Sequence, residues 1–192
     1  MGTTATVREP EFPVDRLFLD RWSPRAFSPE PIPHATLMTL FEAARWAPSC
    51  FNDQPWYFLY ASEESGLQKM RAILMEKNRQ WAGKAPVLAL VCSQKFFKHN
   101  NQPNRWGAFD AGAAWMSLAL QASMLGLCVH GMGGFDVDAA YTTLGLNREK
   151  LDIHAAVAIG RMGDPKLLPE DVASREGPSP RKPLAEVVRV IS

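Results

Sequence analysis

The sequence predicts a three-layer protein in which helices cover both faces of one sheet. Two apolar runs of strand length, 86–92 and 154–160, contain almost no alternation with polar residues. Such runs are typical of strands that are covered on both faces. Segments with apolar residues at helical spacing alternate with these runs along the chain. This alternation places the chain in the α/β or α+β class.

Length and composition indicate one globular domain over 1–192, because 192 residues allow one substantial core. Hydrophobic residues make up 46% of the chain, and 21 basic side chains nearly cancel 20 acidic ones. A nucleic-acid-binding protein usually has a concentrated basic stripe, so no nucleic acid is expected as a partner. The most apolar stretch, 111–126, is interrupted by polar residues, which favours a buried helix over a membrane span.

Cysteine, histidine and glycine patterns exclude several common kinds of site. Three widely spaced cysteines form neither a disulfide framework nor a metal-binding pair, so reduced thiols and a cytoplasmic location are expected. The four histidines lack the partner donors that a metal site needs. Glycines 131, 133 and 134 do not complete a dinucleotide fingerprint, because Asp136 stands where its third glycine would be.

The first half of the chain is expected to contain helices around an aromatic strand. A short helix at 14–18 precedes a proline-dense connector. An apolar stripe at i, i+3, i+4 and i+7 predicts a helix over 34–46, which the next proline ends. The aromatic run 56–60 predicts a buried strand. Ser62 is the expected N-cap of a single helix over 62–79, which opens with two glutamates.

The second half is expected to complete the sheet and its cover. After the covered strand at 86–92, the polar loop 96–107 is long for a compact domain and is therefore a lid candidate. The remaining expected elements are, in order, a helix at 111–126, a strand at 127–129, a glycine-rich turn at 131–134, a helix from Asp136, a covered strand at 154–160, a loop at 165–182 and a β-branched terminal strand at 185–191.

Two short segments near the start carry the most specific pattern. Residues 21–25, Arg-Trp-Ser-Pro-Arg, place two guanidinium groups around a hydroxyl, and these donors suit a phosphate and a polar ring edge. Residues 47–56, Ala-Pro-Ser-Cys-Phe-Asn-Asp-Gln-Pro-Trp, add small and amide side chains on a proline-bounded loop. Together the two segments resemble the signature of the nitroreductase family, dimeric FMN-dependent oxidoreductases. Weaker matches follow in the family's order as far as 181–184.

This resemblance implies an α+β fold with a mostly antiparallel central sheet covered by helices. It also implies an intertwined homodimer with two FMN sites at the subunit interface, in which the strand at 185–191 joins the partner's sheet. The implied reaction is ping-pong: NADH or NADPH passes a hydride to the flavin and leaves, and a nitroaromatic, quinone or similar acceptor is then reduced. No catalytic side chain is implied, because the cofactor carries the chemistry.

The resemblance assigns the residues of 21–25 to the cofactor. Arg21 would bind the FMN phosphate together with Arg181, Ser23 would lie along the ribityl chain, and Arg25 would lie near the N1/O2 edge of the ring. Trp22 lies within the same motif. Taken alone, each of the two basic segments, 21–25 and 181–182, is better explained as a solvated surface pair of cations.

Further matches concern the flavin ring. Asn78 corresponds to the family's asparagine at the O4/N3 edge, with a helix C-cap as the alternative role. Met132, Gly133 and Gly134 match the segment whose backbone passes the flavin N5. Glycine is expected there because a Cβ would collide with the ring and because tight turns use positive φ. An ordinary strand-to-helix turn is the alternative.

A second group of residues would come from the other subunit. The resemblance implies that Pro48, Ser49, Cys50 and Asn52 line the flavin bound mainly by the partner. Cys50 stands where the family usually has a second serine. It is either an oxidisable thiol beside the redox centre or a buried, inert cysteine, and the second interpretation is preferred.

Aromatic residues around the expected lid are candidates to stack on the acceptor, Trp106 and Phe109 in particular. For Phe109, packing against the long helix is the preferred interpretation. Three other functions stay open. The chain could be a flavin enzyme with a dedicated substrate such as an enal, a quinone or flavin itself, a dimeric FMN-binding protein without efficient turnover, or a structural dimer without a cofactor.

Overall fold

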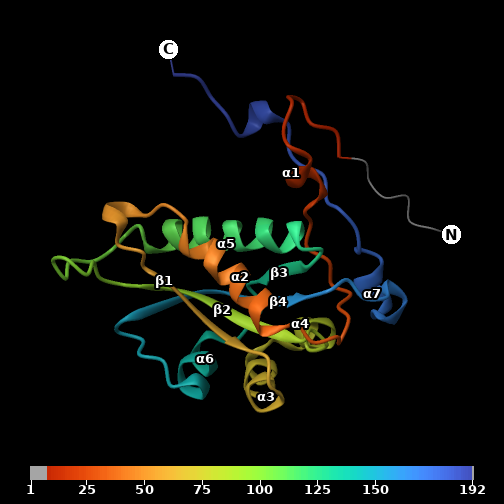
Figure 1. Ribbon diagram of the computed structural model, residues 1–192, viewed down its shortest axis with the longest axis horizontal. Coiled ribbons are helices and arrows are strands. Elements are labelled where there is room, and N and C mark those ends of the chain that lie inside the picture. Colours follow the sequence, from red (N-terminus) through yellow and green to blue (C-terminus); the bar gives the residue numbers. More distant parts are fainter. Residues whose placement is uncertain (1–7, 192) are drawn as a thin grey trace.

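The computed structural model describes residues 8–191, which fold around one four-stranded sheet (Figure 1). All neighbouring strands are antiparallel, in the order β1-β2-β4-β3. The strands are β1 (Trp56–Ala61), β2 (Val87–Gln94), β3 (Cys128–Met132) and β4 (Leu151–Gly160). The two central strands, β2 and β4, are the two apolar runs, and most of their residues are buried.

Helices cover both faces of this sheet, so the predicted α+β class and three layers are confirmed. In Figure 1, α2 and α5 lie on one face, while α3 and α6 lie on the other. The helices are α1 (Arg16–Asp20), α2 (His34–Arg45), α3 (Glu64–Ile73), α4 (Glu76–Ala82), α5 (Gly107–Met124), α6 (Val137–Leu144) and α7 (Glu170–Ala173).

The apolar stripe predicted for 34–46 packs α2 against α5. Leu37, Leu40 and Ala44 are buried on α2, as the spacing required. They contact small and apolar residues of α5, such as Ala114, in a core that continues onto the sheet. Small side chains let the two helix backbones approach closely, and close packing maximises dispersion contacts.

The single helix predicted over 62–79 is wrong, because the chain breaks into α3 and α4. Leu74 and Met75 are extended at the break. The Met75 N–H donates to the Gly134 carbonyl oxygen at 3.1 Å, and Leu74 forms an antiparallel bridge with Phe135. These contacts with a distant segment outweigh the local helical preference. The break therefore fixes the start of α4 against the segment that follows β3.

Other element boundaries also differ from the prediction. Ser62 does not cap α3, since Glu63 occupies the N-cap position without a side-chain hydrogen bond. Helix α5 begins at Gly107, before the predicted 111, and β3 extends through Met132, so part of the expected glycine-rich turn is strand. The tail expected to be loop contains the short helix α7.

The terminal segment 185–191 forms no strand with the chain's own sheet. A 3-10 turn covers Leu184–Glu186, and the apolar residues after it are exposed, with Val190 at 85% and Ile191 at 95%. Its addition to a partner's sheet stays a prediction about a second copy of the chain.

Two searches of the described residues concern membranes and metals. Within 8–191, every helix is too short or too polar to span a lipid bilayer. The same residues contain no cluster of three His, Cys, Asp or Glu side chains that could hold a metal ion.

The α2–α5 contact makes a quantitative prediction about stability. Leu40 is 0% exposed, so Leu40→Ala should leave a cavity and lower the free energy of unfolding by about 3–5 kcal/mol. Leu167→Ala removes the same atoms from a side chain that is 68% exposed, and it should change stability by less than about 0.5 kcal/mol. Urea denaturation at equal protein concentration measures both. Equal losses in the two variants would contradict this packing.

Candidate functional site

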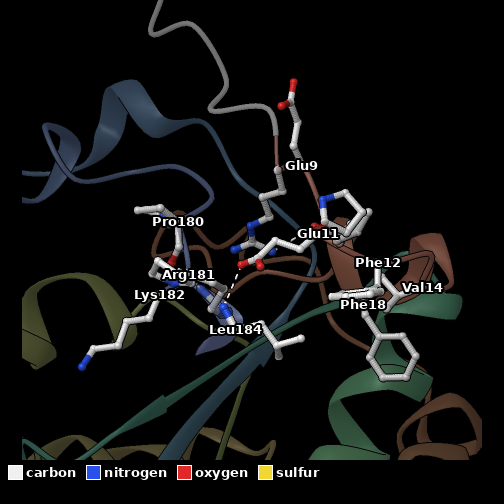
Figure 2. Close-up of a pocket in the computed structure, with 13 residues that line it drawn as sticks. Glu9, Glu11, Phe12, Val14, Phe18, Pro180, Arg181, Lys182 and Leu184 are labelled. Atoms are coloured by element: carbon white, nitrogen blue, oxygen red, sulfur yellow. Dashed lines mark hydrogen bonds between the residues drawn. The ribbon is translucent and has the colours of Figure 1, made fainter. Parts of the chain in front are cut away.

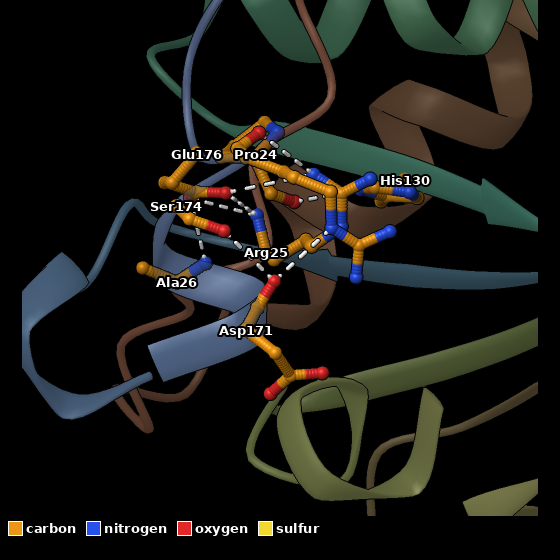
Figure 3. A network of polar contacts seen from close by, with 8 residues as sticks. Pro24, Arg25, Ala26, His130, Asp171, Ser174 and Glu176 are labelled. Atoms are coloured by element: carbon orange, nitrogen blue, oxygen red, sulfur yellow. Dashed lines mark hydrogen bonds and ion pairs between the residues drawn. The ribbon is translucent and has the colours of Figure 1, made fainter. Parts of the chain in front are cut away.

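The segment 21–25 is held against the sheet edge by residues distant in sequence (Figure 3). The His130 Nδ1 atom on β3 lies 2.9 Å from the Pro24 carbonyl oxygen, which can only accept, so Nδ1 carries the proton. The Glu176 carboxylate accepts from the backbone N–H of Arg25 at 2.8 Å and of Ala26 at 2.9 Å. Sequence reasoning missed Glu176, because a single acid in a loop forms no recognisable pattern.

Arg25 has its guanidinium oriented by three neighbours. Its Nη1 donates to the Arg175 carbonyl oxygen at 3.2 Å and lies 3.9 Å from Glu176 Oε2. The Arg25 guanidinium also lies 6.0 Å from the centroid of the Trp81 ring on α4, and the His130 ring packs on the same indole at 4.6 Å. The half-buried Arg25 side chain therefore lies between β3 and α4. Its three neighbours restrain one side of the guanidinium.

Three guanidinium groups gather beside α1, and we call Arg8, Arg21 and Arg181 the arginine cluster. Burial and the charge of Arg181 lower the pKa of Arg21, and burial, Arg181 and Arg21 lower the pKa of Arg8. Arg21 Nη1 donates to Ser23 Oγ at 3.3 Å. Within residues 8–191, no carboxylate forms an ion pair with any of the three. Such a cluster is a favourable place for an anion.

Arg21 and Arg181 are therefore close together, as predicted, whereas sequence reasoning missed Arg8. An isolated arginine near the start of the chain has no local pattern. A proximity signal from co-varying positions would be needed to find it. Trp22, the remaining member of the motif, is half-buried.

Asn78 and Gly134 form the second part of this region. Asn78 Nδ2 donates to the Gly134 carbonyl oxygen at 3.0 Å, and a Cβ added to Gly134 would lie 2.5 Å from that nitrogen. A larger residue at 134 would therefore displace the Asn78 amide from this contact. The alternative role of Asn78 as a C-cap is wrong, because Asn78 lies inside α4 and Gly83 is the C-cap of that helix.

The structure corrects one expectation for the segment 132–134. Gly133 and Gly134 do not have positive φ, so the turn does not explain these glycines. An added Cβ at Gly133 would meet nothing within 4 Å, so its backbone borders open space. The side chain of Met132 is buried in the core, which leaves only its backbone for a ligand.

The loop 48–54 is hydrogen-bonded to the first turn of α5. The Cys50 N–H donates to Asp110 Oδ2 at 3.1 Å, and Ser49 Oγ accepts from the Gln54 N–H at 3.0 Å. Asp110 is buried, and burial raises the pKa of its carboxyl. Pro48 is exposed in the same loop.

The backbone of this loop is strained. Phe51, Asn52 and Gln54 all have φ between 52° and 55°, in the left-handed region that side chains other than asparagine rarely adopt. Such strain persists only where the surroundings enforce it, and it is concentrated at functional sites. The Phe51 ring is 77% exposed and packs edge-on against Phe97 at 5.8 Å.

The three cysteines differ in their environment. Cys92 is fully buried, and burial raises the pKa of its thiol to about 12. Burial also raises the pKa of Cys128. Cys50 is only partly buried within one chain, so its burial at a dimer interface stays a prediction.

The two aromatic candidates lie beside the loop, at the start of α5. Trp106 is the N-cap residue, 40% exposed, and the Arg105 guanidinium lies 4.5 Å from the centroid of its ring. Phe109 is 76% exposed, so its expected packing against the long helix is wrong. Both rings are thus free to contact a ligand or another chain.

One chain does not bring all the predicted residues together. The arginine half-site contains Arg8, Arg21, Trp22, Ser23, Arg25, Asn78, Met132, Gly133, Gly134 and Arg181. The loop half-site contains Pro48, Ser49, Cys50, Asn52, Trp106 and Phe109. In Figure 1 the 48–54 loop lies at the start of α5, and α1 lies towards the other end of that helix. An 18-residue helix rises about 27 Å, so the two half-sites are far apart.

The buried His130 predicts how stability depends on pH. Burial is the main cause that lowers the pKa of His130, so the folded state binds this proton more weakly than the unfolded state does. Stability should therefore decrease as the pH falls below about 6.5, the ordinary pKa of histidine. His130→Asn should reduce this pH dependence without abolishing it, because burial also lowers the pKa of His154.

Urea denaturation between pH 5 and pH 7.5 measures this dependence. His34→Asn, at an exposed position at the start of α2, is the matched control and should keep the wild-type profile. A His130→Asn profile that is identical to that of the wild type would contradict the assignment.

Comparisons with known proteins agree with this fold. A family model described as the nitroreductase family matches residues 19–161. A solved structure of an FMN-containing oxidoreductase is 44% identical, with a TM-score of 0.90 over 98% of this chain and 96% of its own. A Desulfovibrio desulfuricans protein that is provisionally named a nitroreductase has been solved in complex with FMN. It is 26% identical, with a TM-score of 0.74 over 95% of this chain and 99% of its own.

A Streptomyces coelicolor protein, provisionally named as an NADH dehydrogenase/NAD(P)H nitroreductase, is 37% identical over 84 residues. That match spans 43% of this chain and 42% of the relative, so the chain covers less than half of that protein. The family model covers most of the chain, and the similar structures share its layers and sheet. The chain belongs to the nitroreductase family.

Proposed function

We propose that this chain is an FMN-dependent oxidoreductase. It would take a hydride from NADH or NADPH and reduce nitroaromatic, quinone or similar electron-poor acceptors by a ping-pong mechanism. The arginine cluster is the observation that carries this proposal, because three guanidinium groups without a carboxylate partner within 8–191 suit a phosphate. The FMN-containing structure that is 44% identical supports the choice of cofactor.

The remaining residues of the arginine half-site suit the flavin ring. Arg25 offers a restrained guanidinium, and Asn78 offers an amide, so both have donors for a polar ring edge. The backbone at Gly133 borders open space and leaves room for a planar ring. When bound, the flavin supplies reversible hydride transfer, while these residues orient it and set the charge around it.

A homodimer completes the site in this proposal. The loop half-site of one copy closes the arginine half-site of the other, since the two lie at opposite ends of α5 in one chain. Exposed apolar side chains on α5, including Phe109, Met116 and Met124, support a protein interface along this helix. Trp46, at the end of α2, is also exposed.

Trp106 and Phe109 are proposed to contact the acceptor from the loop half-site. Their exposed rings can stack on an aromatic or quinone ring. The strained loop beside them suits this role, because the contacts that enforce its strained backbone also hold its surface in place. An FMN-sequestering protein and a flavin enzyme with a dedicated substrate remain the alternative functions.

Spectroscopy on the purified protein tests the function directly. FMN added in slight excess and then removed by desalting should leave a yellow protein with a flavin absorbance spectrum. Anaerobic NADH or NADPH should bleach that absorbance, and a nitroaromatic or quinone should restore it. Flavin that binds but is not bleached would support the sequestering alternative. A colourless protein would overturn the cofactor assignment.

Complementation between two inactive variants tests the shared site. Arg21→Ala should weaken FMN binding by roughly 1.5–3 kcal/mol, because a hydrogen bond to a charged group is lost. Cys50→Tyr should obstruct the partner's site without changing the arginine half-site. Each variant alone should lack reductase activity at limiting FMN.

Equal amounts of the two variants, unfolded together and refolded, should recover about a quarter of the sites, since only mixed dimers have one intact pair of half-sites. Refolding each variant alone is the control. A mixture that is as inactive as its components would show that one chain supplies both half-sites.

A further inference from the structure

Arg8 connects the two segments that carry the other members of the arginine cluster. Its Nη1 donates to the carbonyl oxygens of Leu19 at 2.9 Å and Arg21 at 2.8 Å. Its Nε donates to the carbonyl oxygen of Ser179 at 3.1 Å. One side chain therefore joins the end of α1 to the segment that leads to Arg181. Arg181 stands 160 positions after Arg21 in the sequence.

Two donors of Arg8 remain after these contacts. A guanidinium has five N–H groups, and the three bonds above use Nε and Nη1. The Nη2 group has no hydrogen-bond partner among residues 8–191. The side chain is half-buried and held in place by backbone carbonyls, so little conformational entropy would be lost when Nη2 binds a ligand.

The space beside Arg8 is large enough for a ligand group. A pocket of about 550 Å³ is bordered by Arg8, Arg181 and Lys182, and its other wall is apolar, with Phe12 and Phe18 (Figure 2). Three cationic side chains thus border one hollow.

The acidic residues at this pocket do not neutralise the cluster. Glu11 Oε1 accepts from the Leu184 N–H at 2.7 Å, and Glu9 points away from the arginines in Figure 2. Neither forms an ion pair with Arg8 in the described structure. Burial and the charges of Arg181 and Arg21 lower the pKa of Arg8, which is the expected effect of cations held together without a counter-ion.

We propose that Arg8 is a third ligand of the FMN phosphate, donating through Nη2 beside Arg21 and Arg181. This inference rests on the proposed function, because it takes the phosphate of FMN as the anion of the cluster. The same side chain fixes the spacing of the other two arginines through its backbone contacts. Both terminal segments of the chain thereby take part in cofactor binding.

A comparison of two flavins tests this assignment. Arg8→Gln keeps a polar side chain of similar length but removes the charge and the guanidinium fork. It should raise the dissociation constant for FMN roughly 10- to 100-fold, the usual effect of losing a hydrogen bond to a charged group. Riboflavin lacks the phosphate, so its dissociation constant should not change. Quenching of flavin fluorescence measures both constants.

Arg16→Gln is the matched control, since Arg16 is an exposed arginine of α1 whose side chain bonds only Asp20 among residues 8–191. It should bind both flavins as the wild type does. Arg8→Lys restores the charge without the fork, and it should recover part of the lost FMN affinity. Far-UV circular dichroism verifies that each variant is folded.

The outcomes separate this inference from the proposed function. If the wild-type protein binds neither flavin, the proposed function fails and this inference fails with it. If Arg21→Ala weakens FMN binding and Arg8→Gln does not, only the role of Arg8 is overturned. If Arg8→Gln weakens FMN and riboflavin equally, Arg8 supports the fold and is not a phosphate ligand.

Discussion

The burial of β2 and β4 on both faces is the constraint on which the rest of the structure depends. Apolar residues make up most of these strands, so helices must cover both sides of the sheet. The polar groups of the candidate site lie instead at the sheet edges and in the connections. The segment 21–25 lies along the edge strand β3, and the loop 48–54 leads into the opposite edge strand β1.

Local sequence patterns predicted the elements whose form depends on their own residues. The stripe on α2 and the apolar runs of β2 and β4 are examples, because their burial follows from residue spacing alone. The break between α3 and α4 could not be predicted in this way. Hydrogen bonding of Met75 to Gly134 decides it, and the two residues are distant in sequence.

In the candidate site, too, local sequence patterns predicted some residues, and contacts between distant segments decided the others. Arg21, Asn78 and Arg181 were recognisable because they stand at positions that resemble a family pattern. Glu176 and Arg8 act through contacts with backbone atoms of other segments, and a residue that binds backbone needs no particular neighbour in the sequence. The exposure of Phe109 was also unpredictable, since an aromatic residue on an apolar helix usually belongs to the core.

The left-handed backbone at Phe51, Asn52 and Gln54 has a consequence for how this protein can evolve. Valine, isoleucine and threonine are strongly disfavoured at such φ values, whatever their side chains would contact. Natural variation in the loop is thereby confined to a small set of residue types. The first turn of α5 has no such backbone restriction, and Phe109 projects from it into solvent. Under the proposed function, a change in acceptor preference is therefore more accessible through substitutions in the helix than through substitutions in the loop.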